Sequence, residues 1–233
     1  MSTRAPSTKR RRAIIRSGLA DQVYGALKEQ ILDMEHSPGE RLVIDQIARE
    51  MGVSGTPVRD ALTRLAAERL IDFAPFRGYT VLPEPTLDEI AQSFEARQAI
   101  EIVAVRLGCK RAEDREIEQL AALHERISSH TYGRRSGSFS QFVKLNQDFH
   151  ELLVRTSRNQ YLVGALHGLY HDVLIARTMH GRGVPDLEHI DEEHRAIIEA
   201  LQRRDADAVE TALARHIGDG ATRVLAARRA PTA

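Results

Sequence analysis

The sequence lacks the features of a membrane or secreted protein. It contains no apolar run of the ~18 residues that a membrane-spanning helix needs. Its N-terminus is polar and basic, without the apolar segment of a secretory signal. Its one cysteine, Cys109, has no internal disulfide partner, which fits a reducing compartment. We therefore expect a cytoplasmic protein with no membrane partner.

Net charge is also absent, because 33 Lys and Arg residues balance 33 Asp and Glu residues. The total charge therefore does not indicate a nucleic-acid partner. With 42% hydrophobic and 28% charged residues, the composition excludes a disordered protein. Basic residues do gather before the first acidic residue, Asp21. We predict that residues 1–16 form a basic disordered arm, which either follows DNA phosphates or only keeps the chain soluble.

Residues 17–82 have the order of a winged helix-turn-helix domain. The predicted helices cover 17–34, 44–51 and 55–68, and the predicted strands cover 70–73 and 79–82. In such a domain the third helix enters the major groove of DNA. The hairpin, called the wing, meets the DNA backbone or the minor groove.

The third predicted helix begins with groups that suit an anion. Ser54 or Thr56 can cap its start, and Pro57 fits its first turn. Its apolar residues face a core, so hydroxyls and arginines point outward beside free backbone N–H groups. An ordinary capped helix would give the same local pattern, and the wing with Arg at its tip favours DNA. The predicted DNA-binding residues are Ser54, Thr56, Arg59, Arg64, Arg77 and Gly78, with Arg59 the foremost.

The remainder of the chain is predicted to be a helical bundle. Residues 83–86, with two prolines, form a linker, and Thr86 begins a capping box with Glu89. The predicted helices cover 86–108, 113–128, 138–156, 160–178, 186–203 and 205–228. We therefore predict a mainly α protein, in which a second domain over 87–228 precedes a tail at 229–233.

Polar residues interrupt the apolar stripes of this bundle. The candidates for a metal site are Asn146, His150, His194 and His216. The histidines lie in stripes of three different helices, and the asparagine lies one turn before the first of them. This set suits a divalent transition metal, with zinc or nickel favoured and iron or manganese as alternatives. Separately satisfied core histidines would give the same pattern, and His167 with His171 is a rival pair.

The first helix of the bundle places Arg97 and Glu101 on the stripe of Ile90 and Phe94. Buried charges are unfavourable unless they are paired or bind a ligand. Either the two residues pair with each other, or Arg97 binds the carboxylate of an effector through its planar guanidinium.

These residues together resemble a known family. The segment from Leu19 to Leu82 resembles the DNA-binding domain of GntR-family bacterial repressors. The residues that carry this resemblance are Pro38-Gly39-Glu40-Arg41-Leu42, Ile47-Ala48, Gly52-Val53-Ser54, Thr56-Pro57-Val58-Arg59-Asp60-Ala61-Leu62, Leu65 and Arg77-Gly78. The region after Pro85 resembles the FCD effector domain of the FadR subfamily, and its short bundle is similar to the VanR-like branch. There the carriers are Arg97, Glu101, Phe149-His150, Asn159, Glu193-His194 and Ala214-Arg215-His216.

The resemblance implies a homodimer that binds a palindromic DNA operator and responds to a small organic acid. It implies metal-ligand roles for the four metal candidates and an effector-contacting role for Arg97. Three departures weaken the match. Gly55 replaces a DNA-contacting Arg, and Arg69 replaces a Gly that ends the helix in a left-handed conformation. Asn146 replaces a more frequent Asp and removes one negative charge from the site.

We therefore predict a transcription regulator, most simply a repressor, whose helical domain binds the effector and forms the dimer. A regulator that responds to metal without an organic effector is one alternative. A metal-dependent hydrolase is another, because three histidines can activate water. Glu151 and Glu193 flank the ligands, but adjacent helical residues point about 100° apart, so neither is expected to share their face. We predict that the protein is not an enzyme.

Overall fold

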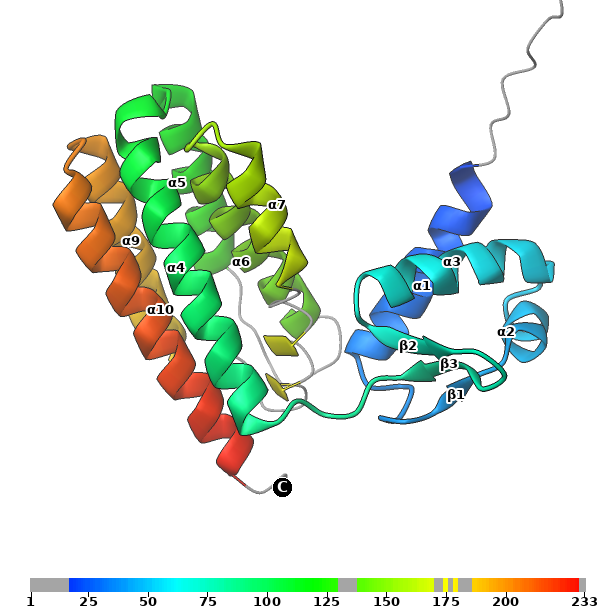
Figure 1. The fold of residues 1–233 in the computed structure, drawn as a ribbon. Helices are drawn as coiled ribbons and strands as arrows, with labels where there is room; N and C mark the ends of the chain where they lie inside the picture. Colours follow the sequence, from blue (N-terminus) through cyan, green and yellow to red (C-terminus); the bar gives the residue numbers. More distant parts are fainter. Residues whose placement is uncertain (1–16, 130–137, 170–173, 176–177, 180–185, 231–233) are drawn as a thin grey trace, which may run out of the picture.

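The computed structural model describes residues 17–129, 138–169, 174–175, 178–179 and 186–230. Figure 1 shows a small mixed domain followed by a bundle of long helices, which confirms the predicted fold class. Within the described residues, no helix is long and apolar enough to cross a membrane.

The N-terminal domain has the predicted helices and one strand that was not predicted. Its elements are α1 (Ser17–Leu32), β1 (Arg41–Leu42), α2 (Ile44–Glu50), α3 (Gly55–Ala67), β2 (Ile71–Ala74) and β3 (Gly78–Val81). The three strands form an antiparallel sheet in the order β1-β3-β2. With only two residues, β1 is too short to show alternation in the sequence.

Helix α3 packs on α1 through one apolar stripe. Val58, Leu62 and Leu65 are fully buried, together with Leu27 and Ile31 of α1. This contact leaves the opposite side of α3 exposed, as the helical spacing predicts.

The end of α3 differs from the expectation for Arg69. This residue adopts a left-handed φ of 54° itself, and the next N–H, of Leu70, donates to the carbonyl of Leu65 at 3.0 Å. The expected loss of the left-handed stop is therefore wrong. The bond and the burial of Leu70 hold Arg69 in a conformation that ordinarily favours glycine.

The bundle contains long helices packed side by side. Its described elements are α4 (Leu87–Arg111), α5 (Asp114–Ser128), α6 (Ser138–Arg155), α7 (Gln160–Gly168), α9 (Leu187–Gln202) and α10 (Ala206–Arg229). The capping box of Thr86 and the cap by Asp205 are confirmed. The side chain of Ser138, predicted to cap α6, lies outside the described residues. Helix α7 ends before its predicted end, because Gly164 and Gly168 lower its helical propensity.

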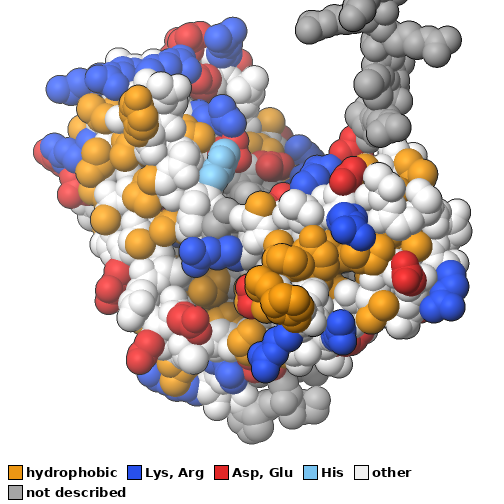
Figure 2. All heavy atoms as spheres, turned by 45° about the vertical axis from the view of Figure 1, so that its right-hand side comes forward, with side chains coloured by type: hydrophobic (Ala, Val, Ile, Leu, Met, Phe, Trp, Pro, Cys, Tyr) orange, Lys and Arg blue, Asp and Glu red, His pale blue; other side chains and the backbone are white. Residues whose placement is uncertain are grey.

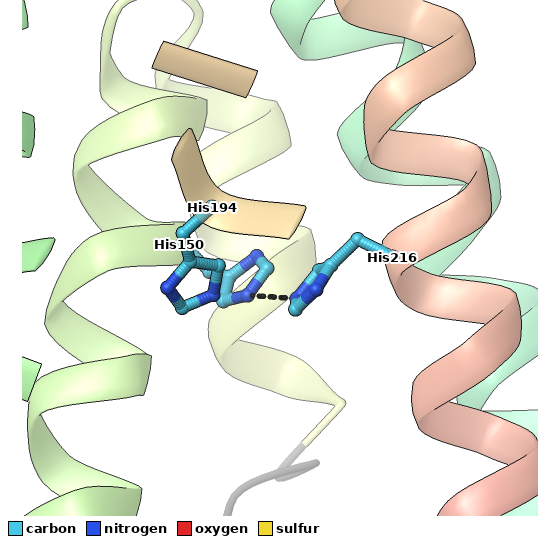
Figure 3. Close-up of side chains that lie close together, drawn as sticks. All are labelled: His150, His194 and His216. Carbon is cyan, nitrogen blue, oxygen red and sulfur yellow. Dashed lines mark hydrogen bonds between the residues drawn. The ribbon is translucent and has the colours of Figure 1, made fainter. Parts of the chain in front are cut away.

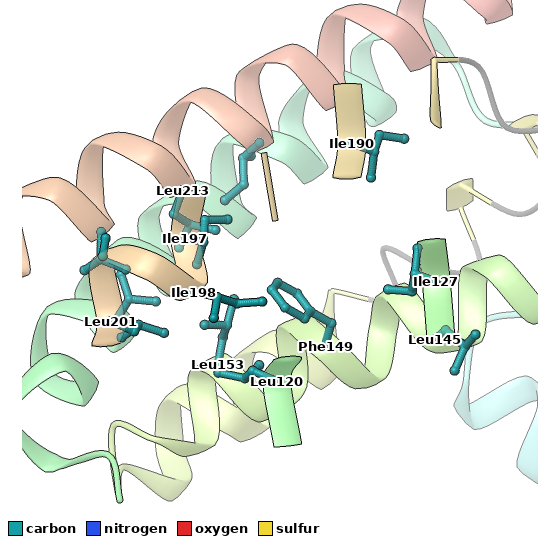
Figure 4. Packing of buried hydrophobic residues seen from close by; sticks show 14 of the residues in the cluster. Leu120, Ile127, Leu145, Phe149, Leu153, Ile190, Ile197, Ile198, Leu201 and Leu213 are labelled. Atoms are coloured by element: carbon teal, nitrogen blue, oxygen red, sulfur yellow. The ribbon is translucent and has the colours of Figure 1, made fainter. Parts of the chain in front are cut away.

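The bundle core brings α4, α5, α6, α9 and α10 together. Figure 4 shows Leu120, Phe149, Leu153 and Ile197 converging between these helices, and all are fully buried. Gly108 allows α4 to approach α6 closely. A Cβ added to Gly108 would lie 2.0 Å from the hydroxyl oxygen of Thr156, so no side chain fits there.

Candidate functional site

The start of α3 exposes its hydroxyls and its backbone. Ser54 is the N-cap residue, but its side chain makes no capping hydrogen bond. The predicted cap is therefore wrong, and the reason is local. The usual donor is the N–H of the third helical residue, and that residue here is Pro57, which has none. Ser54 and Thr56 are both exposed at this helix start, where an anion would be favoured.

Arg59 lies exposed one turn further along α3. Among the described residues, its side chain has no hydrogen-bond or ion-pair partner. Its carbonyl accepts a bond of 2.8 Å from the Thr63 hydroxyl, which also lies 3.1 Å from the hydroxyl of Tyr79 in β3. Thr63 therefore ties the recognition helix to the wing.

Arg64 is exposed, as predicted, but it is turned toward α1. Its guanidinium donates to Asp21 at 2.6 Å and stacks over the ring of Tyr24 at 3.9 Å. Arg64 is therefore occupied in holding α1 against α3. It is not grouped with Ser54, Thr56 and Arg59.

The wing presents two arginines. Arg77 is exposed in the turn of the hairpin, and Gly78 has a φ of 79°, which requires glycine or strain. A nitrogen of the Arg41 guanidinium lies 3.9 Å from the position that a Cβ on Gly78 would occupy. Arg41 was not among the predicted DNA-binding residues, because β1 was not predicted.

The bundle brings three predicted metal ligands together. His150 of α6, His194 of α9 and His216 of α10 converge, as Figure 3 shows, and all three are buried. One ring nitrogen from each lies within 4.8 Å of the others. Asn146 is half-buried one turn before His150, and its role as a fourth ligand stays a prediction.

Two carboxylates fix the orientation of these rings. Nδ1 of His150 lies 2.7 Å from Glu101, and Nδ1 of His216 lies 2.7 Å from Glu193. Burial opposes ionisation of Glu101, but Arg97 and His150 lower its pKa to about 2. His216 and Arg223 likewise lower the pKa of Glu193 to about 2 against the effect of burial. Both carboxylates are therefore ionised, and each accepts the Nδ1 proton of its histidine.

As a result, two imidazole lone pairs face each other. Nε2 of His150 lies 3.1 Å from Nε2 of His216. Burial lowers the pKa of His150 to about 3 and also lowers that of His216, so both rings are neutral near pH 7. Two bare nitrogens at this distance repel unless a cation lies between them. Two nitrogen ligands at ~2.1 Å from a metal lie about 3.0 Å apart in an octahedral site and about 3.4 Å apart in a tetrahedral one, so the observed separation lies in the range of a metal site.

His194 gives a second sign of a missing partner. Its ring is fully buried and stacks on Phe149 at 4.2 Å, and neither ring nitrogen has a hydrogen-bond partner among the described residues. Leaving a buried polar group unpaired costs about 1–3 kcal/mol. Burial lowers the pKa of His194 well below its ordinary value, so the ring offers a lone pair to a metal.

Arg97 and Glu101 pair with each other, which is one of the two predicted alternatives. Nε of Arg97 donates to Glu101 at 2.5 Å, and the other oxygen of Glu101 reaches His150. A continuous chain of contacts therefore joins the predicted effector residue to a metal candidate. The charge of Arg97 also helps to lower the pKa of all three histidines.

The contact of Glu193 with His216 and the part played by Arg223 were not predicted. Arg223 holds Glu193 with two bonds, of 2.9 and 2.8 Å. The expectation that Glu193 does not reach the ligands is wrong, because it contacts His216 on the neighbouring helix. Arg223 lies seven residues after His216 on α10, and this spacing on one stripe was the available signal.

His124 of α5 is a half-buried histidine beside the site. Within the part of the chain that the structure describes, its Nδ1 has no hydrogen-bond partner, and its ring centre lies 6.1 Å from that of His194. Nε2 of His124 lies 3.4 Å from Asp191. Helical spacing cannot reveal which helices are neighbours, so the sequence gave no reason to group His124 with His194.

Of the rival histidine pair, the structure describes only His167, which does not lie among these ligands. His167 is exposed and pairs with Glu151 at 2.9 Å, and His171 lies outside the described residues. His189, Glu193 and Asp219 form a second cluster, and the first two line a groove of about 690 Å³ between α9 and α10. Glu193 is already bound by Arg223 and by His216, so this cluster is the weaker candidate for a metal.

Comparison with known proteins agrees with the division into a winged helix-turn-helix domain and a helical bundle. Residues 19–81 match the model for bacterial regulatory proteins of the gntR family, and residues 92–219 match the FCD domain. The chain is 32% identical to the Nta operon transcriptional regulator of Aminobacter aminovorans, over 77% of this chain and 82% of that protein. It is 28% identical to the HTH-type transcriptional repressor RspR of Escherichia coli, over 84% of each.

Solved structures agree as well. The structure of E. coli McbR/YncC superposes with a TM-score of 0.69 at 25% identity, covering 88% of this chain and 96% of that one. The two sequence relatives are named as a transcriptional repressor and a transcriptional regulator, and McbR of E. coli is likewise named as a transcriptional regulator.

Proposed function

Since the chain belongs to the GntR family and carries an FCD domain, it is a DNA-binding transcriptional regulator, and we propose that a small organic acid bound beside a metal ion controls its binding to DNA. We propose a cytoplasmic repressor with a DNA-binding domain over 17–82, a linker over 83–86 and an effector and dimerisation domain over 87–228. A homodimer would present two recognition helices to the two halves of a palindromic operator.

The DNA contacts in this proposal come from the exposed residues of α3 and the wing. Ser54 and Thr56 contact phosphate at the helix start, and Arg59 reaches a base or a phosphate. Arg77 and Gly78 allow the wing to approach the DNA backbone. Arg64 contributes only after releasing Asp21, because its guanidinium is already held in the free protein.

A divalent metal is the second part of the proposal, and one observation carries it. The facing Nε2 atoms of His150 and His216, each with a carboxylate at Nδ1, need a cation to relieve their repulsion. His194 would supply the third nitrogen and Asn146 an amide oxygen. This set suits zinc or nickel, and iron or manganese less well. The metal would supply a Lewis-acidic binding point for a carboxylate.

Arg97 links the effector to the metal in this proposal. A carboxylate that binds the Arg97 guanidinium competes with Glu101, which also holds His150. Effector binding would thereby change the contacts of α4 with α6. His124, with its unpaired Nδ1, is a candidate donor to the same carboxylate. A ligand shifts the balance between two states only when it binds one of them better.

A metal-responsive regulator without an organic effector is the second candidate. The observation that favours it is the Arg97–Glu101 pair, which already satisfies the buried guanidinium without a ligand. Metal alone would then switch DNA binding.

The test uses duplexes that the wild-type protein selects from a random pool. We expect one class of small carboxylic acid to change the affinity of zinc-loaded protein for a selected duplex by roughly 5- to 150-fold. The effect should be lost in Arg97→Gln and in His194→Ala, and kept in His167→Ala. A full change on adding zinc alone supports the metal-responsive alternative, and no response to zinc or to any acid contradicts both proposals.

A further inference from the structure

The turn of the wing places a large aromatic residue in a left-handed backbone conformation. Ala74 and Gly78 end the two strands, and the N–H of Arg77 donates to the carbonyl of Ala74 at 3.1 Å. Pro75 and Phe76 therefore occupy the two central positions of the turn. Phe76 has a φ of 67°, a conformation that glycine or asparagine would adopt with less strain.

The side chain of Phe76 is not stabilised by packing in this position. It is 105% exposed, the highest value among the large hydrophobic residues that the structure describes. An aromatic ring in water and a left-handed backbone are both unfavourable, and no contact within the described chain offsets them. Strain without a structural reason is a mark of a functional position.

The surroundings of Phe76 indicate which partner it meets. Arg77 follows it directly, and the guanidinium of Arg41 lies beside Gly78. Figure 2 shows a face of the molecule on which hydrophobic side chains gather between Lys and Arg side chains. An apolar protein surface would not favour these positive charges, whereas the negatively charged backbone of a nucleic acid would.

The wing is also held in a fixed relation to the recognition helix. Tyr79 of β3 contacts the Thr63 hydroxyl of α3 at 3.1 Å, and its ring packs on Phe73 with centres 4.9 Å apart. In Figure 1 the turn between β2 and β3 lies at the end of the domain where α3 begins. Phe76 therefore projects from a braced hairpin joined to the helix that binds DNA.

We propose that Phe76 is a wedge that enters the minor groove of DNA beside the site of α3 and partly unstacks one base step. Apolar wedges in the minor groove unstack bases and bend the duplex, and adjacent arginines hold the groove. The inference rests on the DNA-binding function of the chain and adds a contact that reads deformability. It predicts a preference for easily unstacked pyrimidine–purine steps on either side of the half-sites.

The test compares wing variants on a duplex that the wild-type protein selects from a random pool. Phe76→Asn and Phe76→Gly remove the ring and tolerate a positive φ, while Phe76→Tyr keeps the ring. We expect the first two to bind the duplex roughly 5- to 100-fold more weakly and Phe76→Tyr to bind like wild type. With 2-aminopurine at the flanking steps, only the proteins with a ring should raise its fluorescence.

Stability separates this loss from unfolding. Removing the strain should leave the thermal midpoint of Phe76→Asn equal to wild type or higher, while its DNA affinity falls. Tyr161→Asn, which removes an aromatic side chain 80% exposed on α7, is the matched control and should bind DNA like wild type. The wedge is overturned if Phe76→Asn and Phe76→Gly keep full affinity and the fluorescence signal. Failure of the wild type to select any duplex would instead contradict DNA binding itself.

Discussion

The two domains differ in where their candidate functional groups lie: on the surface in the N-terminal domain and inside the core in the bundle. In the N-terminal domain the buried cluster is apolar, and Ser54, Thr56 and Arg59 lie outside it. In the bundle the candidate groups lie inside. Within the described residues, every buried polar or charged side chain belongs to the bundle, including Arg97 and Glu101.

In the N-terminal domain, the residues that would bind DNA are therefore not the residues that stabilise the fold. In the bundle, the same buried residues would do both. An exposed side chain can be removed with little effect on folding. A buried charge that loses its partner destabilises the protein, because the remaining charge is left without solvation. The following predictions test that contrast, beginning with the largest effect.

Glu101→Ala should destabilise the bundle most. The change leaves Arg97 buried without its partner and removes the acceptor of His150 Nδ1. We expect a loss of about 3–5 kcal/mol in the free energy of unfolding, measured by urea denaturation. Glu118→Ala, at an exposed position of α5, is the control and should change it by less than about 0.5 kcal/mol. Equal effects of the two variants would contradict the contrast.

In the presence of a chelator, which removes any bound metal, a fall in pH should destabilise the protein because buried His150 must take up a proton. Burial lowers the pKa of His150 to about 3 from its ordinary 6.5, so the unfolded state binds more protons between these values. The stability that this histidine contributes is therefore present above pH 6.5 and falls as the pH decreases toward 3. Thermal midpoints measured across this range should fall, and the fall should be smaller in His150→Leu. The same slope in the variant would argue against a neutral buried His150.

Gly108→Ala should destabilise the protein by about 1–3 kcal/mol, because the added Cβ meets Thr156 between α4 and α6. Gly218→Ala is the matched change in α10. Apart from the backbone of its own helix, no atom of the described residues lies within 4 Å of its added Cβ, so the change should be neutral or stabilise the helix by up to about 1 kcal/mol. Thermal denaturation distinguishes the two, and a stabilising Gly108→Ala would mean that the helices are further apart.

Arg59→Ala should leave stability unchanged and weaken DNA binding. Its side chain has no partner within the described chain, so the thermal midpoint should stay within experimental error. A base contact contributes about 1–3 kcal/mol at one position of the operator, whereas a phosphate contact weakens binding to all sequences. Affinities across a salt series distinguish the two. Arg64→Ala should show the reverse order, with a larger effect on stability through Asp21 and Tyr24.

The same contrast explains what could be predicted from the sequence. Helical spacing identified the buried stripe of α3, and it identified His150, His194 and His216 because polar residues on apolar stripes stand out. Spacing does not report which helices become neighbours. The contact of Glu193 with His216 and the position of His124 beside His194 were therefore not predicted.

The sequence predicts which side chains are exposed better than it predicts which side chains contact each other. Arg64 lies outside the core as expected, but its pairing with Asp21 depends on the packing of α1 on α3. The exposure of Phe76 was not predicted from the sequence, because neither the positive φ of the turn nor the exposure of the ring follows from the residue type.

The central claim, a metal held by buried histidines, is tested most directly by metal analysis of the protein purified without chelator or an affinity metal. The account predicts about one divalent transition metal per wild-type chain, none in His194→Ala and an unchanged amount in His167→Ala. Wild type that is as free of metal as His194→Ala, and that takes up no zinc or nickel on addition, would contradict it.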